Sequence, residues 1–536
     1  MPKYSSILTY LQANRKDATM KLMELYQDRI IGATRGLDRI RFRGTLRLLA
    51  NQNGLRKFMS FTRVLLKDFG GWAEGLTAMI RQSCRAKADE LGLETHYLER
   101  PSIDKEKYAR EIAESKGIKE GPICMLSAVE PCIAPMVKGN KRQKKLQLVM
   151  AHRKCVFVYH YFNDPVFGFG HVRIQSWLPF NIFICLNGRH WLEKQLQSKG
   201  IGYSKDGNCF PWIEDIDAGQ DLLNKQLETN WSDVLMKLAS KSCPALAEVV
   251  RPLRPDYYWS ADNTEWATDI MFNSTKSLDS IYPSLLHHAM RVSDSASVMR
   301  YFGRRQLGGI YPDEIVSDYR RRYEGIRVKH SKNYNSIKMY NKSGSVLRIE
   351  TTINSTRDFK VYRHPDDNLN RPASWQKMRK GVADLHRRCK ISDQCNNRYA
   401  DVLASAQAEE KLKEIVAPAC NKIRKNGKRY RGLNPWQEQD YQLLSFLAKG
   451  ENTLNGFRNK DLRRRLYPES EDADEKQYRK YAGRTTRRVK LLRAHGLVRK
   501  VAKENRYVLT SKGRKFACAL MCASAVDIKG LTELAA

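Results

Sequence analysis

Several common signatures are absent from this chain of 536 residues. Its twelve cysteines are scattered from Cys84 to Cys522, with no CxxC pair and no cysteine beside a histidine cluster. We therefore expect reduced thiols in the protein core and no structural zinc site. The phosphate-binding pattern GxxxxGK[ST] is also missing, and no GxGxxG follows an expected strand. These absences predict that the protein uses no nucleotide cofactor.

Long apolar runs are missing as well. The longest uncharged apolar run, Ser176 to Gly188, is too short to cross a bilayer, and it contains Pro179 and Asn181. The first residues lack the apolar stretch of a signal peptide, and no lipidation signal is present. We expect a cytoplasmic protein, of the bacterial cytosol or nucleoid, that has no membrane partner.

Acidic residues are scarce relative to basic ones. Lys and Arg total 95 against 58 Asp and Glu, which gives a net charge of +37. A folded protein tolerates that self-repulsion most readily when a polyanion neutralises it. DNA is the partner that we favour, and RNA is the alternative. Because 42% of the residues are hydrophobic and 10% aromatic, packed domains are expected rather than disorder.

The spacing of apolar residues divides the chain into four parts. Residues 1–120 show helical spacing and many basic residues, although Arg39 to Gly44 alternates like a strand. Residues 121–363 combine alternating segments with helical ones, which predicts an antiparallel sheet covered by helices. Residues 364–433 read as a helical connector with a basic linker, and residues 434–536 as a final domain. The predicted fold class is α+β.

The central part contains the clearest strand predictions. Two adjacent alternating segments are separated by a turn-rich stretch, and another two by the hairpin turn Lys342-Ser343-Gly344. A further alternating run lies between the pairs. The five predicted strands are Lys154–Phe162, Gly170–Trp177, Tyr257–Phe272, Ile326–Tyr340 (interrupted at 333–335) and Ser345–Asn354.

The last hundred residues show a distinctive order of elements. Helices are predicted at Pro435–Lys449, Lys460–Leu466 and Tyr478–His495, and strands at Leu497–Val501 and Arg506–Leu509. The four residues between the two strands have the length and polarity of a wing. The segments Leu491-Leu-Arg-Ala-His-Gly-Leu-Val-Arg499 and Arg506-Tyr-Val-Leu-Thr-Ser-Lys-Gly513 resemble winged-helix proteins, in particular bacterial regulators of the MarR type.

The resemblance implies that the long basic helix enters the major groove of DNA while the wing touches the backbone. It leaves the oligomeric state open, with a dimer as one option. The linker before this domain, Asn421 to Leu433, adds six Lys or Arg in thirteen residues. The residues expected to contact nucleic acid are Lys425, Lys428, Arg429, Arg479, Lys480, Arg484, Arg487, Arg488, Lys490, Arg493, Lys503 and Arg506.

Charged residues on the central strands suggest chemistry. Alternation places Lys338, Tyr340 and Lys342 on one face of a strand, where Arg348 and Glu350 of the next strand could meet them. Separately, Glu265 and Asp269 are four residues apart, which puts both on the same face of a strand or a helix.

The arrangement Ser336-Ile-Lys-Met-Tyr-Asn-Lys342, a turn, then Leu347-Arg-Ile-Glu350 resembles rolling-circle replication initiators of plasmids and filamentous phages. The resemblance implies that Tyr340 is a nucleophile that cuts one DNA strand, while Lys338 and Lys342 balance phosphate charge. It also implies that Glu350, with Glu265 or Asp269, holds Mg²⁺ or Mn²⁺. The chain departs from many relatives in lacking their His-hydrophobic-His metal motif.

Other interpretations stay open. Asp262, Asp269 and Glu350 could form an acidic set of the RuvC or transposase kind, and Tyr340 and Glu350 could be ordinary sheet residues in cross-strand pairs. Our leading hypothesis is a mobile-element protein that binds DNA and cuts or joins one strand. The alternative is a binding protein without chemistry. That protein would be a DNA-binding regulator, or an RNA-binding protein of a ribonucleoprotein, whether RNA-guided or not.

Overall fold

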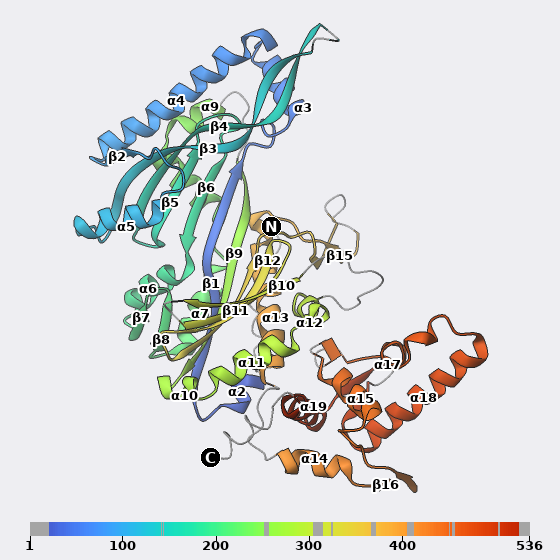
Figure 1. Cartoon of the computed structure of the whole chain (residues 1–536). Helices are drawn as coiled ribbons and strands as arrows, with labels where there is room; N and C mark the ends of the chain where they lie inside the picture. Colours follow the sequence, from blue (N-terminus) through green and yellow to red (C-terminus); the bar gives the residue numbers. More distant parts are fainter. Residues whose placement is uncertain are drawn as a thin grey trace. The chain divides into compact units, whose positions relative to one another are not determined.

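The structure is a computed structural model of the chain, shown in Figure 1. It describes residues 21–140, 142, 144–250, 257–303, 315–322, 325–365, 371–404, 412–449, 451–452, 456–501 and 504–524. Large numbers of helical and strand residues occur together, which confirms the α+β class. The contacts divide the chain into two compact units, each made of separate segments. The first comprises 1–33, 269–351 and 393–536, and the second comprises 34–268 and 352–392.

Eleven of the described strands form one sheet in the order β10-β11-β12-β13-β9-β1-β6-β5-β4-β3-β2. β2 and β3 are parallel, whereas β3-β4-β5-β6-β1 and β10-β11-β12 pair antiparallel. The strand bounds are β1 Ile30–Thr45, β2 Glu94–Tyr97, β3 Gly121–Asn140, β4 Lys145–Asp164, β5 Gly168–Gln175, β6 Ile182–Asn187, β9 Tyr258–Phe272, β10 Ile315–Arg322, β11 Gly325–Lys332, β12 Asn335–Lys342 and β13 Val346–Ile353.

The second unit has a large apolar core on one face of its strands. Ile40 and Phe42 of β1 point into it, together with Val172, Ile174 and Ile184 of the neighbouring strands. Helices cover this face because their apolar sides pack on the same cluster. They are α3 Gln52–Phe61, α4 Phe69–Glu90, α6 Gly188–Lys199, α7 Ile216–Gln226, α8 Trp231–Ser242 and α9 Ala245–Val250. A smaller cluster on the strands β3 and β4 packs under α5, Lys105–Ser115.

The prediction of a helical region over residues 1–120 is wrong for part of that range. Residues 30–45 form the 16-residue strand β1, far longer than the short strand expected near Arg39. Arg39 and Arg41 are exposed, whereas Ile40 and Phe42 are fully buried. This two-residue alternation outweighs the helical spacing because the even positions find a core on one face only. The helices α3, α4 and α5 lie in the remainder of the range.

The other central predictions are largely confirmed. The expected strands at 154–162 and 170–177 lie mainly within the antiparallel neighbours β4 and β5, and 257–272 corresponds to β9. Helix α6 begins directly after β6, and its first N–H groups are capped by the side chain of Asn187. β3 and β4 are each 20 residues long, which the sequence had not indicated.

In the first unit, β10 pairs antiparallel with β11, and β11 pairs antiparallel with β12. β13 is the next strand of the sheet after β12. The interruption at 333–335 is the turn between β11 and β12, where Asn333 is left-handed at φ 51°. The predicted turn Lys342-Ser343-Gly344 is confirmed, with φ of 52° at Ser343 and 72° at Gly344. Other helices of the chain are α2 Lys21–Leu25, α10 Thr275–Asp279, α11 Tyr282–Val292, α12 Ser295–Tyr301, α13 Leu385–Leu403 and α14 Leu412–Cys420.

The C-terminal part of the first unit has its own apolar core, formed by residues such as Leu444, Phe457, Leu492 and Phe516. The predicted elements are confirmed in order, with an added bridge between Phe457 and Tyr507. They are α15 Glu438–Ala448, α17 Asn459–Leu466, α18 Glu475–Ala494, β18 Val498–Lys500, β19 Tyr507–Leu509 and α19 Ser511–Ala523.

The basic linker is more ordered than predicted. Its residues form the hairpin β16 Ile423–Lys425 and β17 Lys428–Tyr430, and its turn residues Asn426 and Gly427 are both left-handed. Asn-Gly is a favoured dipeptide for such two-residue turns.

Two further observations concern the described residues. Ten cysteines are free thiols, nine of them buried, as expected for core thiols. None of the described helices combines the length and apolar character that crossing a bilayer requires.

Candidate nucleic-acid interface

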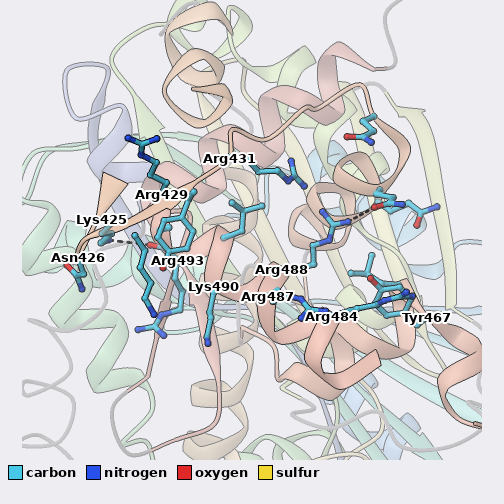
Figure 2. A pocket seen from close by; sticks show the side chains of 18 of the residues that line it. Lys425, Asn426, Arg429, Arg431, Tyr467, Arg484, Arg487, Arg488, Lys490 and Arg493 are labelled. Carbon is cyan, nitrogen blue, oxygen red and sulfur yellow. Dashed lines mark hydrogen bonds between the residues drawn. The ribbon is translucent and has the colours of Figure 1, made fainter. Parts of the chain in front are cut away.

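Helix α18 and the hairpin β16–β17 line a hollow of about 1400 Å³ in the first unit, shown in Figure 2. Nine of its lining residues are Lys or Arg, and Glu469 is the only acidic one among them. The cationic residues are Lys425, Lys428, Arg429, Arg431, Arg484, Arg487, Arg488, Lys490 and Arg493. This density of positive charge around an open hollow matches an anionic ligand.

The helix α18 supplies most of these cations because of its spacing. Arg484, Arg487 and Lys490 recur every three residues, which places them along one side of the helix, and all three are exposed. Val489 and Leu492 point the other way into the core. The N-terminus of the helix is capped by Asp474, whose carboxylate accepts the N–H of Gln477.

A buried carboxylate fixes one wall of the hollow. Asp440 is fully buried, and its two oxygens accept hydrogen bonds from Arg431 at 2.6 and 2.7 Å and from Arg488 at 2.9 Å. The N–H of Asn434 donates to the same carboxylate at 2.9 Å. Burial alone would raise the pKa of Asp440, but the hydrogen bonds of Arg431 and Asn434, with the charge of Arg488, hold it below its ordinary value.

Most of the predicted contact residues therefore come together at the hollow, eight of the twelve in all. Arg488 has a structural role there, because it is committed to Asp440. The hairpin residues Lys428 and Arg429 are exposed, and the ammonium group of Lys425 donates to the carbonyl of Arg493 at 3.4 Å. Arg431 was not among the predicted contacts, although it lies in the same basic linker.

The remaining predicted contact residues lie elsewhere. Arg479 and Lys480 are exposed on α18 but do not line the hollow, and Arg479 pairs with Glu475 at 2.5 Å. Arg506, directly before β19, pairs with Glu504 at 2.9 Å. Lys503 lies outside the described residues.

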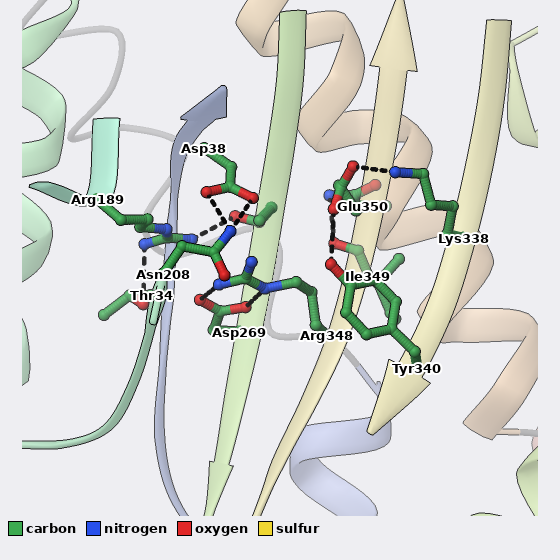
Figure 3. Close-up of polar contacts among 12 residues, drawn as sticks. Thr34, Asp38, Arg189, Asn208, Asp269, Lys338, Tyr340, Arg348, Ile349 and Glu350 are labelled. Carbon is green, nitrogen blue, oxygen red and sulfur yellow. Dashed lines mark hydrogen bonds and ion pairs between the residues drawn. The ribbon is translucent and has the colours of Figure 1, made fainter. Parts of the chain in front are cut away.

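On the central strands of the first unit, Glu350 meets the two predicted partners on β12. One of its oxygens accepts from the ammonium group of Lys338 at 2.6 Å, and the other accepts from the Tyr340 hydroxyl at 2.8 Å (Figure 3). Burial would raise the pKa of Glu350, but the charge and hydrogen bond of Lys338 lower it overall. The carboxylate of Glu350 is therefore ionised, and it accepts the hydrogen bond that the Tyr340 hydroxyl donates.

Two other predicted site residues, Asp269 and Lys342, are buried in the protein. Asp269 forms a two-point ion pair with Arg348 at 2.5 and 2.8 Å, and both side chains are completely buried (Figure 3). Both oxygens of Asp269 are thus engaged by a guanidinium, and Arg348 points to Asp269 rather than toward Tyr340. Lys342 is buried at the end of β12, with 8% of its surface exposed. It is therefore poorly placed to meet a phosphate.

In the second unit, Glu265 of β9 lies near an acid that sequence reasoning missed. A carboxylate oxygen of Glu265 and one of Asp38 on β1 are within 4.8 Å of each other. Asp38 is 2% exposed, and both its oxygens accept from the amide of Asn208, at 2.7 and 2.6 Å (Figure 3). Asp38 is an isolated acid among arginines in the sequence, so no local pattern marked it.

Comparison with known proteins gives no guide to the role of these residues, because no protein-family model, curated protein or solved structure matches the chain.

Proposed function

We propose that this protein binds nucleic acid, with duplex DNA held at the basic hollow of the first unit. The observation that carries the proposal is the exposed row Arg484, Arg487 and Lys490 on α18, facing a hollow that also contains the cations of the β16–β17 hairpin. Lysines and arginines on phosphates release condensed counterions, which supplies most of the free energy of such binding.

Duplex DNA fits this arrangement better than a small anion. The major groove is about 12 Å wide and admits one α-helix, and α18 presents its cations along a 20-residue length. The hairpin β18–β19 follows directly after α18, at the position that a wing occupies in the proteins the sequence resembles. The order of helices and hairpin therefore supports, in this proposal, a winged-helix mode of docking.

The test is a binding titration of the full chain with a fluorescently labelled DNA duplex at fixed salt. We expect the triple variant Arg484→Ala, Arg487→Ala, Lys490→Ala to bind at least tenfold more weakly. A matched control removes three exposed cations outside the hollow, with Lys237→Ala, Lys241→Ala and Lys276→Ala. Equal losses in both variants would show that overall charge, and not the hollow, is responsible. Binding of duplex RNA in place of duplex DNA would reassign the partner.

A second candidate function is the cutting of one DNA strand, and the contact between Tyr340 and Glu350 favours it. Glu350 is positioned to take the phenol proton as the Tyr340 oxygen attacks phosphorus, and Lys338 orients the carboxylate from its other side. The P–O bond to one deoxyribose breaks in the same step, and that sugar oxygen leaves as a hydroxyl after taking a proton from water. This is the nucleophile, base and orienting group that covalent catalysis needs. In this proposal Glu350 acts as a base and not as a ligand of Mg²⁺ or Mn²⁺.

Strand cutting is tested by incubating supercoiled and single-stranded DNA with the protein and Mn²⁺. We expect Tyr340→Phe to abolish nicking and the covalent protein–DNA product, while duplex affinity stays at the wild-type level. Tyr319→Phe, which removes the hydroxyl of a 44% exposed tyrosine on β10, is the control. Nicking by Tyr340→Phe at the wild-type rate would exclude the tyrosine mechanism and leave a binding protein without chemistry.

A further inference from the structure

One face of the sheet in the second unit carries arginine and aromatic side chains that are aligned across four strands. The pairings of β1 with β6, β6 with β5 and β5 with β4 align these residues in rows. The first row is Arg43, Phe183, Arg173 and Tyr159, and the second is Arg41, Cys185, His171 and Tyr161. Such rows arise because every second residue of each strand faces the same side.

The opposite face of these strands is buried in the large core, so the arginine rows lie on the outer face. Helix α5 covers the end of that face at β3 and β4, where Tyr159 and Tyr161 are buried. Toward β1 the rows become accessible: Arg41 is exposed, and 51% of the Arg39 side chain is exposed although it contacts Glu106. The accessible part of this face therefore consists of arginines with half-buried phenylalanine rings beside them.

The guanidinium groups and the rings are interleaved. Arg173 lies 3.9 Å from the ring centre of Phe157 and 4.8 Å from that of Phe183, while Arg43 lies 5.5 Å from Phe183. At the edge formed by α5, Arg110 lies 3.9 Å from the ring of Phe169. These contacts hold the planar groups of both kinds in place before any ligand arrives.

The face is strongly positive. Burial and the charges of Arg39, Arg173 and Arg41 lower the pKa of His171 to about 3, so its ring stays neutral among the arginines. Glu106 and Glu130 are the acids seen to pair with these arginines, and Glu130 is itself buried between Arg173 at 2.5 Å and Lys105 at 3.0 Å. Arg41 and Arg43 provide two more positive charges at the accessible end.

From this geometry we infer that the outer face of β1, β6 and β5 is a second nucleic-acid site, specific for unpaired strands. Phosphates meet Arg39, Arg41 and Arg43, and bases stack on the phenylalanine rings and guanidinium planes beside them. In a duplex the base faces are hidden, so rings and guanidinium planes on a sheet can be used only by unpaired bases. The site is separate from the basic hollow in the first unit and does not depend on the function proposed for it.

The test uses the full chain in which the hollow has been disabled by the triple alanine variant of α18. This protein is titrated into a labelled single strand of about 12 nucleotides. That length lies within the range of about 4–16 nucleotides that single-strand binding domains cover. Adding Arg41→Ala and Arg43→Ala should weaken binding at least tenfold. The matched control Lys237→Ala and Lys241→Ala removes the same charge from α8, on the other face of the sheet, and should change binding less than twofold.

A second measurement covers the case in which the arginine variant does not fold. Ultraviolet cross-linking of the wild-type protein to the single strand, followed by peptide mapping, should label peptides that contain Phe183 or Phe169. The inference is wrong if cross-links fall only in other peptides. It is also wrong if the arginine and control variants lose affinity equally, or if a blunt duplex competes for the face as well as a single strand does.

Discussion

The carboxylate of Asp440 offers a sharp test of how the basic hollow is held together. The substitution Asp440→Asn keeps the shape of the side chain but replaces one acceptor oxygen with an NH₂ donor. In the folded protein each oxygen accepts two hydrogen bonds, three of the four coming from Arg431 and Arg488. The asparagine can keep two of them, and its NH₂ group then faces the donors of the other two.

The expected cost follows from those contacts. A hydrogen bond to a charged group contributes about 1.5–3 kcal/mol net, so losing two would cost about 3–6 kcal/mol. The Arg431 side chain is 46% exposed, so solvent screens part of its interaction and the lower end applies. We expect a loss of about 3 kcal/mol in the local stability of the segment that contains Asp440.

The assay is hydrogen exchange of the full chain at neutral pH, followed in peptides from α15. About 3 kcal/mol corresponds to exchange roughly 150-fold faster at amides that exchange by local opening. Glu438→Gln removes an exposed carboxylate from the same helix and should leave exchange nearly unchanged. If the α15 peptides of Asp440→Asn exchange within threefold of wild type, the Asp440 carboxylate does not stabilise this wall of the hollow.

The stability that the Asp440 carboxylate contributes should fall only in acid. Because folding lowers the pKa of Asp440, its stabilisation is complete above the ordinary value near 4 and disappears as the pH falls through the lowered value. The difference between wild type and Asp440→Asn should therefore be constant from pH 5 to 8 and shrink only in stronger acid. A difference that already shrinks between pH 7 and 5 would point to another titrating group.

Three further outcomes are expected. The triple variant of α18 should flatten the slope of log affinity against log salt by about 2.7, because each lost phosphate contact removes about 0.9; an unchanged slope would place the phosphates elsewhere. Gly513→Ala should lower the melting temperature of the C-terminal part, because the added Cβ would lie 1.9 Å from the Leu497 carbonyl oxygen. Gly483→Ala should leave that temperature unchanged, because nothing lies within 4 Å of its added Cβ. Glu350→Gln breaks the largely buried ion pair between Lys338 and Glu350 and should cost about 3–5 kcal/mol in denaturant unfolding. A cost below 1 kcal/mol would count against that ion pair.

The sequence by itself determined the features that depend on neighbours along the chain. The three-residue recurrence of Arg484, Arg487 and Lys490 specifies a basic helical side, because helix geometry is local. Alternation along β12 and β13 also correctly placed Glu350 opposite Lys338 and Tyr340. Those two strands are joined by a short hairpin, so their register follows from the turn.

Only the tertiary structure decided which distant residues meet. Asp440 and Arg488 are 48 residues apart, and Asp269 and Arg348 are 79 apart, so no spacing rule could pair them. Tertiary structure also decided that residues 30–45 form a strand. Their local pattern fits a strand or a helix, and only the core beneath Ile40 and Phe42 favours the strand. The arginine rows likewise form only because β1, β6, β5 and β4 are neighbours in the sheet. That order differs from the order of the strands along the chain, so the sequence does not reveal it.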